Sequence, residues 1–262
     1  PFAISIPRGK TLIHSTIDPV DLNKTLPTQY ALIGDARLTL QALLEACRKQ
    51  LSTRRDASAV TREIKAVESE WMKEWLPRLT SDETPFTPYR VLWDLQRTVD
   101  VSETIITHDA GSPRDQLMPF WKTKKPLTYI GWGKTTQLGY GLGLAMGAKL
   151  VHPDKLCINV WGDAAIGFTG TDFETAVRER LPILSILLNN NSMAIELKVM
   201  PQATEKFRAT DISGDYAAMA RAFGGYGERV TGIAEIVAAI KRGIRQAQGG
   251  KPGLLVFMTT EQ

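Results

Sequence analysis

Residues 156–192 read LCINVWGDAAIGFTGTDFETAVRERLPILSILLNNNS, and this stretch decides the fold. Mainly apolar runs occupy 156–161 and 183–188, and each ends in polar residues, Gly162-Asp163 and Asn189-Asn190-Asn191 respectively. Apolar runs of this length suit buried strands of a parallel sheet, and the pattern at 172–180 indicates a helix between them. The stretch therefore predicts a strand–helix–strand unit whose two polar strand ends lie side by side.

The same alternation continues on both sides of this unit. We expect further strands at 104–107 and 254–258, and helices at 89–99, 139–150, 216–223 and 233–248. Strands separated by helices of this length form a parallel sheet with helices on both faces. Residues 86–262 are thus predicted to be one α/β domain, with ligands at the carboxyl ends of its strands.

The first third of the chain has a different pattern. Strands are expected at 11–15 and 31–33, followed by an amphipathic helix that Asp35 caps, so residues 1–50 are interpreted as the end of a preceding, central α/β domain. Residues 51–85 are highly charged and helical in pattern, and they end in a turn signal at 81–85, which predicts a helical linker. The chain begins at Pro1, which favours a fragment or a processed chain.

Composition narrows the function classes. The 262 residues carry a net charge of +4, without the basic clusters among aromatics that nucleic-acid binding requires. The two cysteines, Cys47 and Cys157, form no CxxC motif, which argues against a zinc site or a disulfide scaffold and favours a reducing, cytoplasmic setting. No apolar run reaches the roughly 20 residues of a membrane helix. We expect neither a nucleic-acid nor a membrane partner.

The strand ends carry the residues that suggest chemistry. Asp163 and Asn190 lie 27 residues apart, each after an apolar strand, and with the carbonyl of Ser192 they offer the hard oxygen ligands that Mg²⁺ prefers. Ala164 and Ala165 are small residues at a strand-to-helix turn, where backbone N–H groups can approach a phosphate. The alternative is that Asp163 is only a turn residue and that the Asn run is only a loop.

The spacing of these residues resembles a known cofactor motif. Gly162-Asp163-Ala164, followed by Asn189-Asn190, is similar to the Gly-Asp-Gly…Asn-Asn motif of thiamine-diphosphate enzymes, with Ala164 in place of the third glycine. The resemblance implies that Asp163, Asn190 and Ser192 hold Mg²⁺ on the diphosphate, and that Gly162, Ala164 and Ala165 lie against the cofactor.

Two flanking segments extend the resemblance. The segment 105–126, with Asp109-Ala110-Gly111-Ser112, is similar to the acetolactate synthase segment that touches the diphosphate, which implies contacts from Gly111 and Ser112. There Pro113 replaces the family's histidine and removes its contacts. The glycine-rich helix at 139–150 has its counterpart in the family, and the preceding residues Thr136 and Leu138 would hold the aminopyrimidine. Leu138 would wedge between the two cofactor rings and so serve catalysis, unless it is simply a core residue.

The resemblance points to two branches of the family. The sequence of residues 162–182 is most similar to 2-hydroxyacyl-CoA lyases and oxalyl-CoA decarboxylases, whereas that of residues 105–148 is closer to acetolactate synthases. The resemblance implies a carboligase, lyase or decarboxylase that acts on a 2-keto acid or an acyl-CoA. It also implies a homodimer or tetramer, with a separate N-terminal pyrimidine domain that supplies the catalytic glutamate.

Other interpretations stay open. A NAD-dependent oxidoreductase would need a strand directly before the glycines of 139–143, and none is expected there. A non-catalytic relative could keep the fold and the cofactor without the chemistry. Among the remaining residues, Glu196 is a candidate for the substrate side and His108 for the diphosphate loop. His14 and His152 are expected to be structural.

Overall fold

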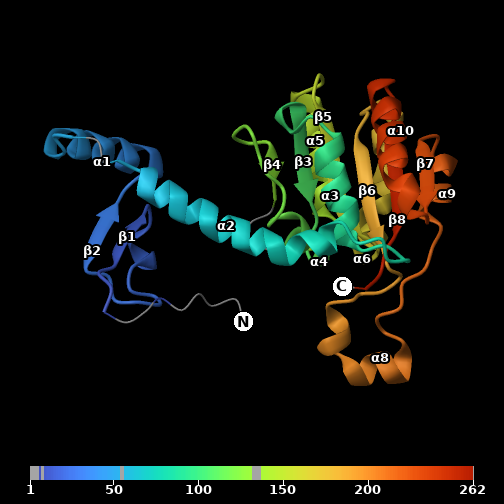
Figure 1. Ribbon diagram of the computed structural model, residues 1–262, viewed down its shortest axis with the longest axis horizontal. Coiled ribbons are helices and arrows are strands. Elements are labelled where there is room, and N and C mark those ends of the chain that lie inside the picture. Colours follow the sequence, from blue (N-terminus) through green and yellow to red (C-terminus); the bar gives the residue numbers. More distant parts are fainter. Residues whose placement is uncertain (1–5, 7–8, 54–55, 132–136, 262) are drawn as a thin grey trace. The chain divides into compact units, whose positions relative to one another are not determined.

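The computed structural model describes residues 6, 9–53, 56–131 and 137–261 (Figure 1). Contacts within the chain divide it into two units, residues 1–68 and 69–262. The long helix α2 (Ser58–Leu79) runs through the division between them.

The first unit contains two short parallel strands and a helix. β1 (Ile13–Thr16) pairs with β2 (Tyr30–Ile33), and the 3-10 turn η1 (Pro19–Asp21) lies in the connection between them. Helix α1 (Ala36–Gln50) follows, and Oδ1 of Asp35 accepts a hydrogen bond from the N–H of Leu38 at 3.0 Å. The predicted cap is therefore confirmed, because this bond satisfies one of the free N–H groups of the first turn.

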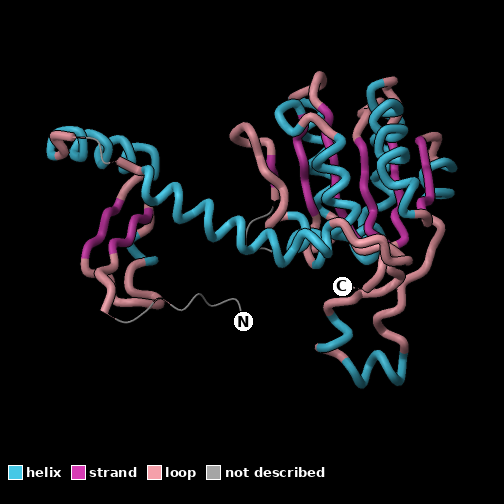
Figure 2. The backbone as a smooth tube through the Cα atoms, viewed as in Figure 1, coloured by secondary structure: helices cyan, strands magenta, loops and turns pink. Residues whose placement is uncertain are grey.

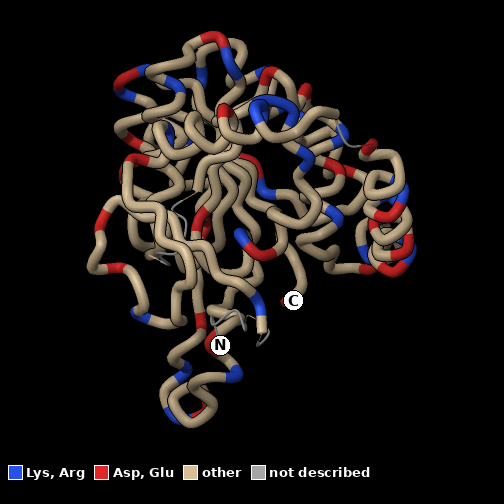
Figure 3. The backbone as a smooth tube through the Cα atoms, turned by 90° about the vertical axis from the view of Figure 1, so that its left-hand side faces the viewer, with Lys and Arg blue, Asp and Glu red and all other residues tan. Residues whose placement is uncertain are grey.

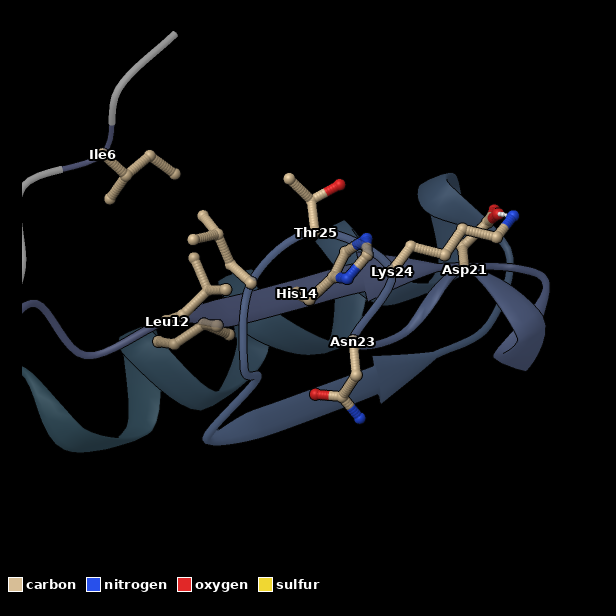
Figure 4. A pocket seen from close by; sticks show the side chains of 9 residues that line it. Ile6, Leu12, His14, Asp21, Asn23, Lys24 and Thr25 are labelled. Atoms are coloured by element: carbon tan, nitrogen blue, oxygen red, sulfur yellow. Dashed lines mark hydrogen bonds and ion pairs between the residues drawn. The ribbon is translucent and has the colours of Figure 1, made fainter. Parts of the chain in front are cut away.

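A cavity of about 210 Å³ lies in the same unit. Figure 4 shows that its lining includes side chains from β1 and the residue before it, from η1 and from the loop after η1. The side chains of Asp21 and Lys24 form an ion pair, with 2.5 Å between Nζ and Oδ1. The lining mixes apolar and polar side chains, namely Ile6, Leu12, Ile13, His14, Asp21, Asn23, Lys24, Thr25 and Leu26. His14 thus lines this cavity, and the cavity contains no member of the candidate cofactor site.

The second unit is built on a six-stranded sheet in which every described pairing is parallel. The strand order is β4-β3-β5-β6-β8-β7, and the strands lie side by side in Figure 2. The strands are β3 (Thr104–His108), β4 (Tyr129–Ile130), β5 (Leu156–Gly162), β6 (Leu184–Asn189), β7 (Tyr226–Val230) and β8 (Gly253–Met258). The prediction of a parallel α/β sheet is confirmed.

Helices cover both faces of this sheet, as predicted. One buried cluster includes α3 (Pro88–Thr98), α4 (Ser112–Leu117) and α10 (Ile236–Gln248), and its side chains pack against one face of the strands. The other includes α5 (Tyr140–Val151), α6 (Asp163–Thr169), α7 (Phe173–Arg178) and α9 (Tyr216–Ala222) on the opposite face. The carboxyl ends of the strands lie between these layers, with α8 (Pro201–Phe207) beyond them (Figure 1).

Some predicted boundaries were wrong. The helix expected at 172–180 begins already at Asp163 as α6, passes through the 3-10 turn η3 (Gly170–Asp172) and continues as α7. Buried Ala165, Ile166 and Phe173 hold this stretch on the sheet despite the low helix propensity of its glycines. Further 3-10 turns are η2 (Val101–Glu103), η4 (Glu196–Lys198) and η5 (Ile233–Glu235), the last of which replaces the expected start of α10.

The surface charges have mixed sign. Lys and Arg positions are interspersed with Asp and Glu positions along the tube in Figure 3. Of the helices that the structure describes, none combines the length and apolar character that a membrane crossing demands.

Candidate cofactor site

The polar ends of β5 and β6 meet at the carboxyl edge of the sheet. The two strands pair in register, with Gly162 opposite Leu188, so that the residues which follow each strand are neighbours. Helices α4 and α6 begin at this edge, and the loop after β6 leads from it to α8 (Figure 1). This is the edge at which parallel sheets bind ligands.

Asp163 is the first residue of α6, and its carboxylate organises the loop after β6. Its Oδ1 accepts a hydrogen bond from the N–H of Ala164 at 2.9 Å, and its Oδ2 accepts from the N–H groups of Asn190 at 3.2 Å and Ser192 at 3.1 Å. The same N–H of Ser192 lies 3.0 Å from Oδ1 of Asn190. A shared donor brings the carboxylate oxygen and the amide oxygen together, so both can face one ligand.

A second segment holds this loop in place. Asn191 has a left-handed backbone, with φ of 59°, and its N–H donates to Oδ1 of Asn189 at 3.0 Å. Its carbonyl accepts from the N–H of Ile212 at 3.0 Å, and the N–H of Met193 donates to the carbonyl of Thr210 at 2.8 Å. The segment that contains α8 therefore returns to the loop and fixes its backbone, which the sequence had not indicated.

The side chains at this edge offer oxygen atoms around one buried carboxyl group. Asp163 is almost fully buried, with 4% of its surface exposed, and burial raises the pKa of its carboxyl while the backbone hydrogen bonds from Ser192 and Ala164 oppose that rise. Throughout the part of the chain that the structure describes, no three His, Cys, Asp or Glu side chains cluster as a metal site. The donor set here is instead one carboxylate with amide and carbonyl oxygens, which fits Mg²⁺ better than a soft metal.

The predicted diphosphate loop after β3 lies beside α6. Gly111 has φ of 82°, and α4 begins at the next residue, Ser112. Pro113 occupies the first turn of α4, where the missing N–H costs little, and its Cγ is 3.5 Å from the position that a Cβ on Gly162 would take. A Cβ on Gly111 would lie 3.8 Å from Cδ1 of Ile195. The structure thus brings Gly111 and Gly162 to the same edge.

The predicted ring-binding residues are only partly visible. Thr136 lies outside the described residues. Leu138 is half-buried and packs against the core cluster that contains α5 and α6. It immediately precedes Gly139, which has φ of 94°. Leu138 therefore lies where the glycine-rich helix begins, in contact with the core and not fully enclosed by it.

One residue at this edge was missed by the sequence reasoning. Asp109 directly follows β3 and is fully buried, and its carboxylate accepts hydrogen bonds from the N–H groups of Gly139 at 2.8 Å and Gly141 at 3.1 Å. Burial raises the pKa of this carboxyl, opposed by those backbone hydrogen bonds. The available signal was an acid immediately after a buried strand, the same signal that identified Asp163.

The other candidates have simpler surroundings. His108 is buried beside Tyr129, with 5.2 Å between ring centroids, and its Nδ1 lies 3.1 Å from the carbonyl oxygen of Asp109. Burial lowers the pKa of this imidazole. Glu196 is half-buried in η4, close in sequence to the loop after β6, whereas His152 is exposed at the end of α5.

The fold and the oxygen-lined edge define a cofactor-binding α/β domain. Residues 109–257, more than half of the chain, match the sequence model of the "Thiamine pyrophosphate enzyme, C-terminal TPP binding domain". The chain belongs to this family, and the predicted kinship with thiamine-diphosphate enzymes is confirmed.

Among curated proteins, the chain is similar to acetolactate synthases. It is 24% identical to a probable acetolactate synthase large subunit of Methanococcus aeolicus, over 89% of this chain and 41% of that protein. It is 27% identical to the mitochondrial acetolactate synthase catalytic subunit of Saccharomyces cerevisiae, over 88% of this chain and 33% of that protein. It is 24% identical to the acetolactate synthase isozyme 3 large subunit of Escherichia coli, over 95% of this chain and 43% of that protein. The chain therefore spans less than half the length of each of these relatives.

Proposed function

We propose that the carboxyl edge of the second unit binds Mg²⁺ and the diphosphate of thiamine diphosphate, and that the protein forms or cleaves carbon–carbon bonds of 2-keto acids, as an acetolactate synthase does. One observation carries this proposal: the N–H of Ser192 lies within hydrogen-bond distance of both Oδ2 of Asp163 and Oδ1 of Asn190. Two hard oxygens from neighbouring strand ends are thereby directed to one place.

The metal ligands in this proposal are Asp163, Asn190 and the carbonyl of Ser192. The carboxylate supplies the negative charge, and the amide and carbonyl add neutral oxygens, which leaves room for phosphate oxygens on the same ion. Burial raises the pKa of the Asp163 carboxyl, and a bound cation would offset the cost of keeping this buried group charged. Mg²⁺ would anchor the cofactor and take no direct part in the reaction of the substrate.

The diphosphate contacts in this proposal come from backbone groups. Gly111 and Ser112 precede and open α4, and Gly162, Ala164 and Ala165 surround the start of α6. Ala164 lies in the first turn of this helix, where a Cβ is tolerated, so the departure from the family's third glycine does not disturb the backbone. Small side chains at this turn let an anion come close to the backbone.

The ring end of the cofactor is assigned to Thr136 and Leu138. Their backbone groups would bond the aminopyrimidine, and the Leu138 side chain would support the cofactor from the core side of the ring site. When bound, thiamine diphosphate supplies the electron sink for the bond that is formed or broken. The protein's part is to bind, to orient and to exclude water.

The remaining parts of the enzyme follow from the family resemblance. We propose that an N-terminal pyrimidine domain supplies the glutamate that faces the pyrimidine, and that two or four chains assemble so that each site lies between two domains. The alternative is an acyl-CoA substrate, as in 2-hydroxyacyl-CoA lyases or oxalyl-CoA decarboxylases, because the sequence of residues 162–182 is most similar to that branch. A non-catalytic relative would bind the cofactor without turnover.

Product analysis separates these possibilities. The full-length protein is incubated with thiamine diphosphate and Mg²⁺ and with pyruvate, pyruvate plus 2-ketobutyrate, 2-hydroxyacyl-CoA or oxalyl-CoA in turn. The proposal expects 2-aceto-2-hydroxy acids from the keto acids. Aldehyde or formyl-CoA from the CoA esters would favour the alternative branch, and cofactor binding without product would favour the non-catalytic relative.

The metal assignment is tested by substitution at Asp163. Asp163→Ala removes the one carboxylate and two of the hydrogen bonds that order the loop, so we expect at least about 100-fold weaker binding of Mg²⁺ and pyrophosphate, in line with the loss of a charged ligand. Titration calorimetry measures this affinity. Asp172→Ala, at an exposed aspartate of η3, is the matched control. Unchanged affinity in the first variant would refute the assignment.

A further inference from the structure

Asp109 occupies a position that the proposed function does not yet use. It is fully buried directly after β3, and both of its carboxylate oxygens face backbone N–H groups. Oδ1 accepts from Ala110 at 3.0 Å and from Gly139 at 2.8 Å, and Oδ2 accepts from Gly141 at 3.1 Å. A buried carboxylate is costly unless it is hydrogen-bonded, and charge-assisted bonds of this kind are strong and directional.

The same glycines are held from their carbonyl side as well. The hydroxyl of Thr169 donates to the carbonyl oxygen of Gly139 at 2.7 Å, and the hydroxyl of Thr107 donates to that of Gly141 at 2.9 Å. Three side chains, from β3, from α6 and from the residue after β3, therefore bind both the N–H and the carbonyl of Gly139 and of Gly141. This is more than the start of a helix requires, because intrahelical bonds satisfy carbonyls there.

Close packing leaves these peptides little freedom. A Cβ on Gly139 would come within 2.8 Å of Cγ2 of Thr169, and one on Gly141 within 2.5 Å of Oδ1 of Asn159. Leu138 is bonded directly to Gly139, and Thr169 is the last residue of the helix that Asp163 begins. A continuous series of contacts thus connects the proposed ring contact with the proposed metal ligand.

We propose that Asp109 is a positioning residue, whose carboxylate fixes Leu138 relative to Asp163 so that the ring end and the diphosphate end of the cofactor are held at one separation. The inference rests on the proposed function, which assigns those two residues to the two ends. Asp109 acts through the backbone of Gly139 and touches no substrate.

Asp109→Asn is the informative substitution. It keeps the size of the side chain but places an NH₂ group at one of two oxygen positions that both accept backbone N–H bonds, so a donor faces a donor whichever way the amide turns. Asp154→Asn, at an exposed aspartate before β5, is the matched control. Thr169→Val removes the bond to the carbonyl of Gly139 with little change in volume, and it tests the same series of contacts if Asp109→Asn does not fold.

The expected result separates the two ends of the cofactor. In the full-length protein, affinity for Mg²⁺ and pyrophosphate should stay within about twofold of wild type, because no diphosphate contact changes. Exchange of the C2 proton of bound thiamine diphosphate, followed by NMR, should slow by about tenfold or more, the effect of losing one charge-assisted hydrogen bond. Hydrogen exchange at the amides of Gly139 and Gly141 should accelerate.

A double substitution distinguishes positioning from general stability. If Asp109 acts through Leu138, then Asp109→Asn combined with Leu138→Ala should exchange the C2 proton no more slowly than Leu138→Ala alone. Additive effects would overturn the inference, as would an equal loss of pyrophosphate affinity or wild-type exchange in Asp109→Asn. Failure of the wild-type protein to bind thiamine diphosphate would instead overturn the proposed function and the inference with it.

Discussion

Two glycines of α5 show how one residue can decide the packing of the site. A Cβ on Gly141 would come within 2.5 Å of Oδ1 of Asn159 and 3.1 Å of Oδ2 of Asp109, whereas a Cβ on Gly143 meets nothing within 4 Å. Gly141→Ala should therefore destabilise the protein by about 1–3 kcal/mol through overpacking. Gly143→Ala should stabilise it by about 0.5–1 kcal/mol, because alanine is the better helix former.

Urea denaturation of the two variants and the wild type measures this difference. An equal slope of the unfolding free energy against urea concentration shows that the unfolding reaction is unchanged. Equal midpoints for Gly141→Ala and Gly143→Ala would show that β5 and the end of β3 do not pack against Gly141 as closely as described.

At the residue scale, the spacing in the sequence predicted that Asp163 and Asn190 meet, and the structure has this contact. Asp163 and Asn190 each end an apolar run, so their meeting followed from the pairing of adjacent parallel strands. The role of Asp109 did not follow, because its partners Gly139 and Gly141 lie about 30 residues later across a segment with no periodic signal. A contact of this kind depends on the position of α5 relative to β3, and local sequence patterns do not predict that position.

At the scale of elements, long and strongly periodic segments were predictable, and so was the charged helix α2, whereas the edge strands β7 and β4 of the large sheet were not. The pattern at 89–99 corresponds closely to α3, and that at 233–248 to α10 with its preceding turn. Strand β7 was missed because Glu228 and Arg229 interrupt its apolar pattern at the sheet edge, where charged residues are tolerated. Strand β4 has only two residues, too few for any period to show.

The amino end of β3 carries an ion-pair cluster that gives a pH prediction. Glu103, in the turn before β3, pairs with Lys125 and Lys155, with 2.5 Å between Oε1 and Nζ of Lys125. These two ammonium groups lower the pKa of Glu103 from 4.5 to about 2. Since the pKa is lower in the folded state, the stability that the pairs provide is present above pH 4.5 and is lost as the pH falls towards 2.

Glu103→Gln should accordingly melt below wild type at neutral pH, with a difference that shrinks as the pH falls through that window and as salt is added. Calorimetric melting temperatures across the acidic range test this, with Glu205→Gln, at an exposed glutamate of α8, as the control. A difference that is independent of pH would show that Glu103 contributes by packing and not by charge.

At the scale of the whole molecule, binding of the cofactor fragment should be confined to one unit. All proposed metal and diphosphate residues belong to residues 69–262. A ligand that binds the folded state alone stabilises it by about 2.7 kcal/mol at 100 times its dissociation constant. Mg²⁺ with pyrophosphate should therefore raise the melting temperature of the second unit, and a chelator should reverse the shift.

Hydrogen exchange places this stabilisation along the chain. With Mg²⁺ and pyrophosphate present, amides at 111–117, 162–165 and 189–193 should exchange more slowly, because backbone groups that contact the anion or order the loop lose their local opening. Residues 9–53 should exchange as before. Asp163→Ala should remove the protection in all three segments together, since one carboxylate joins α6 to the loop after β6. Protection that spread evenly over both units, or that survived this substitution, would mean that the ion and the diphosphate bind elsewhere on the molecule.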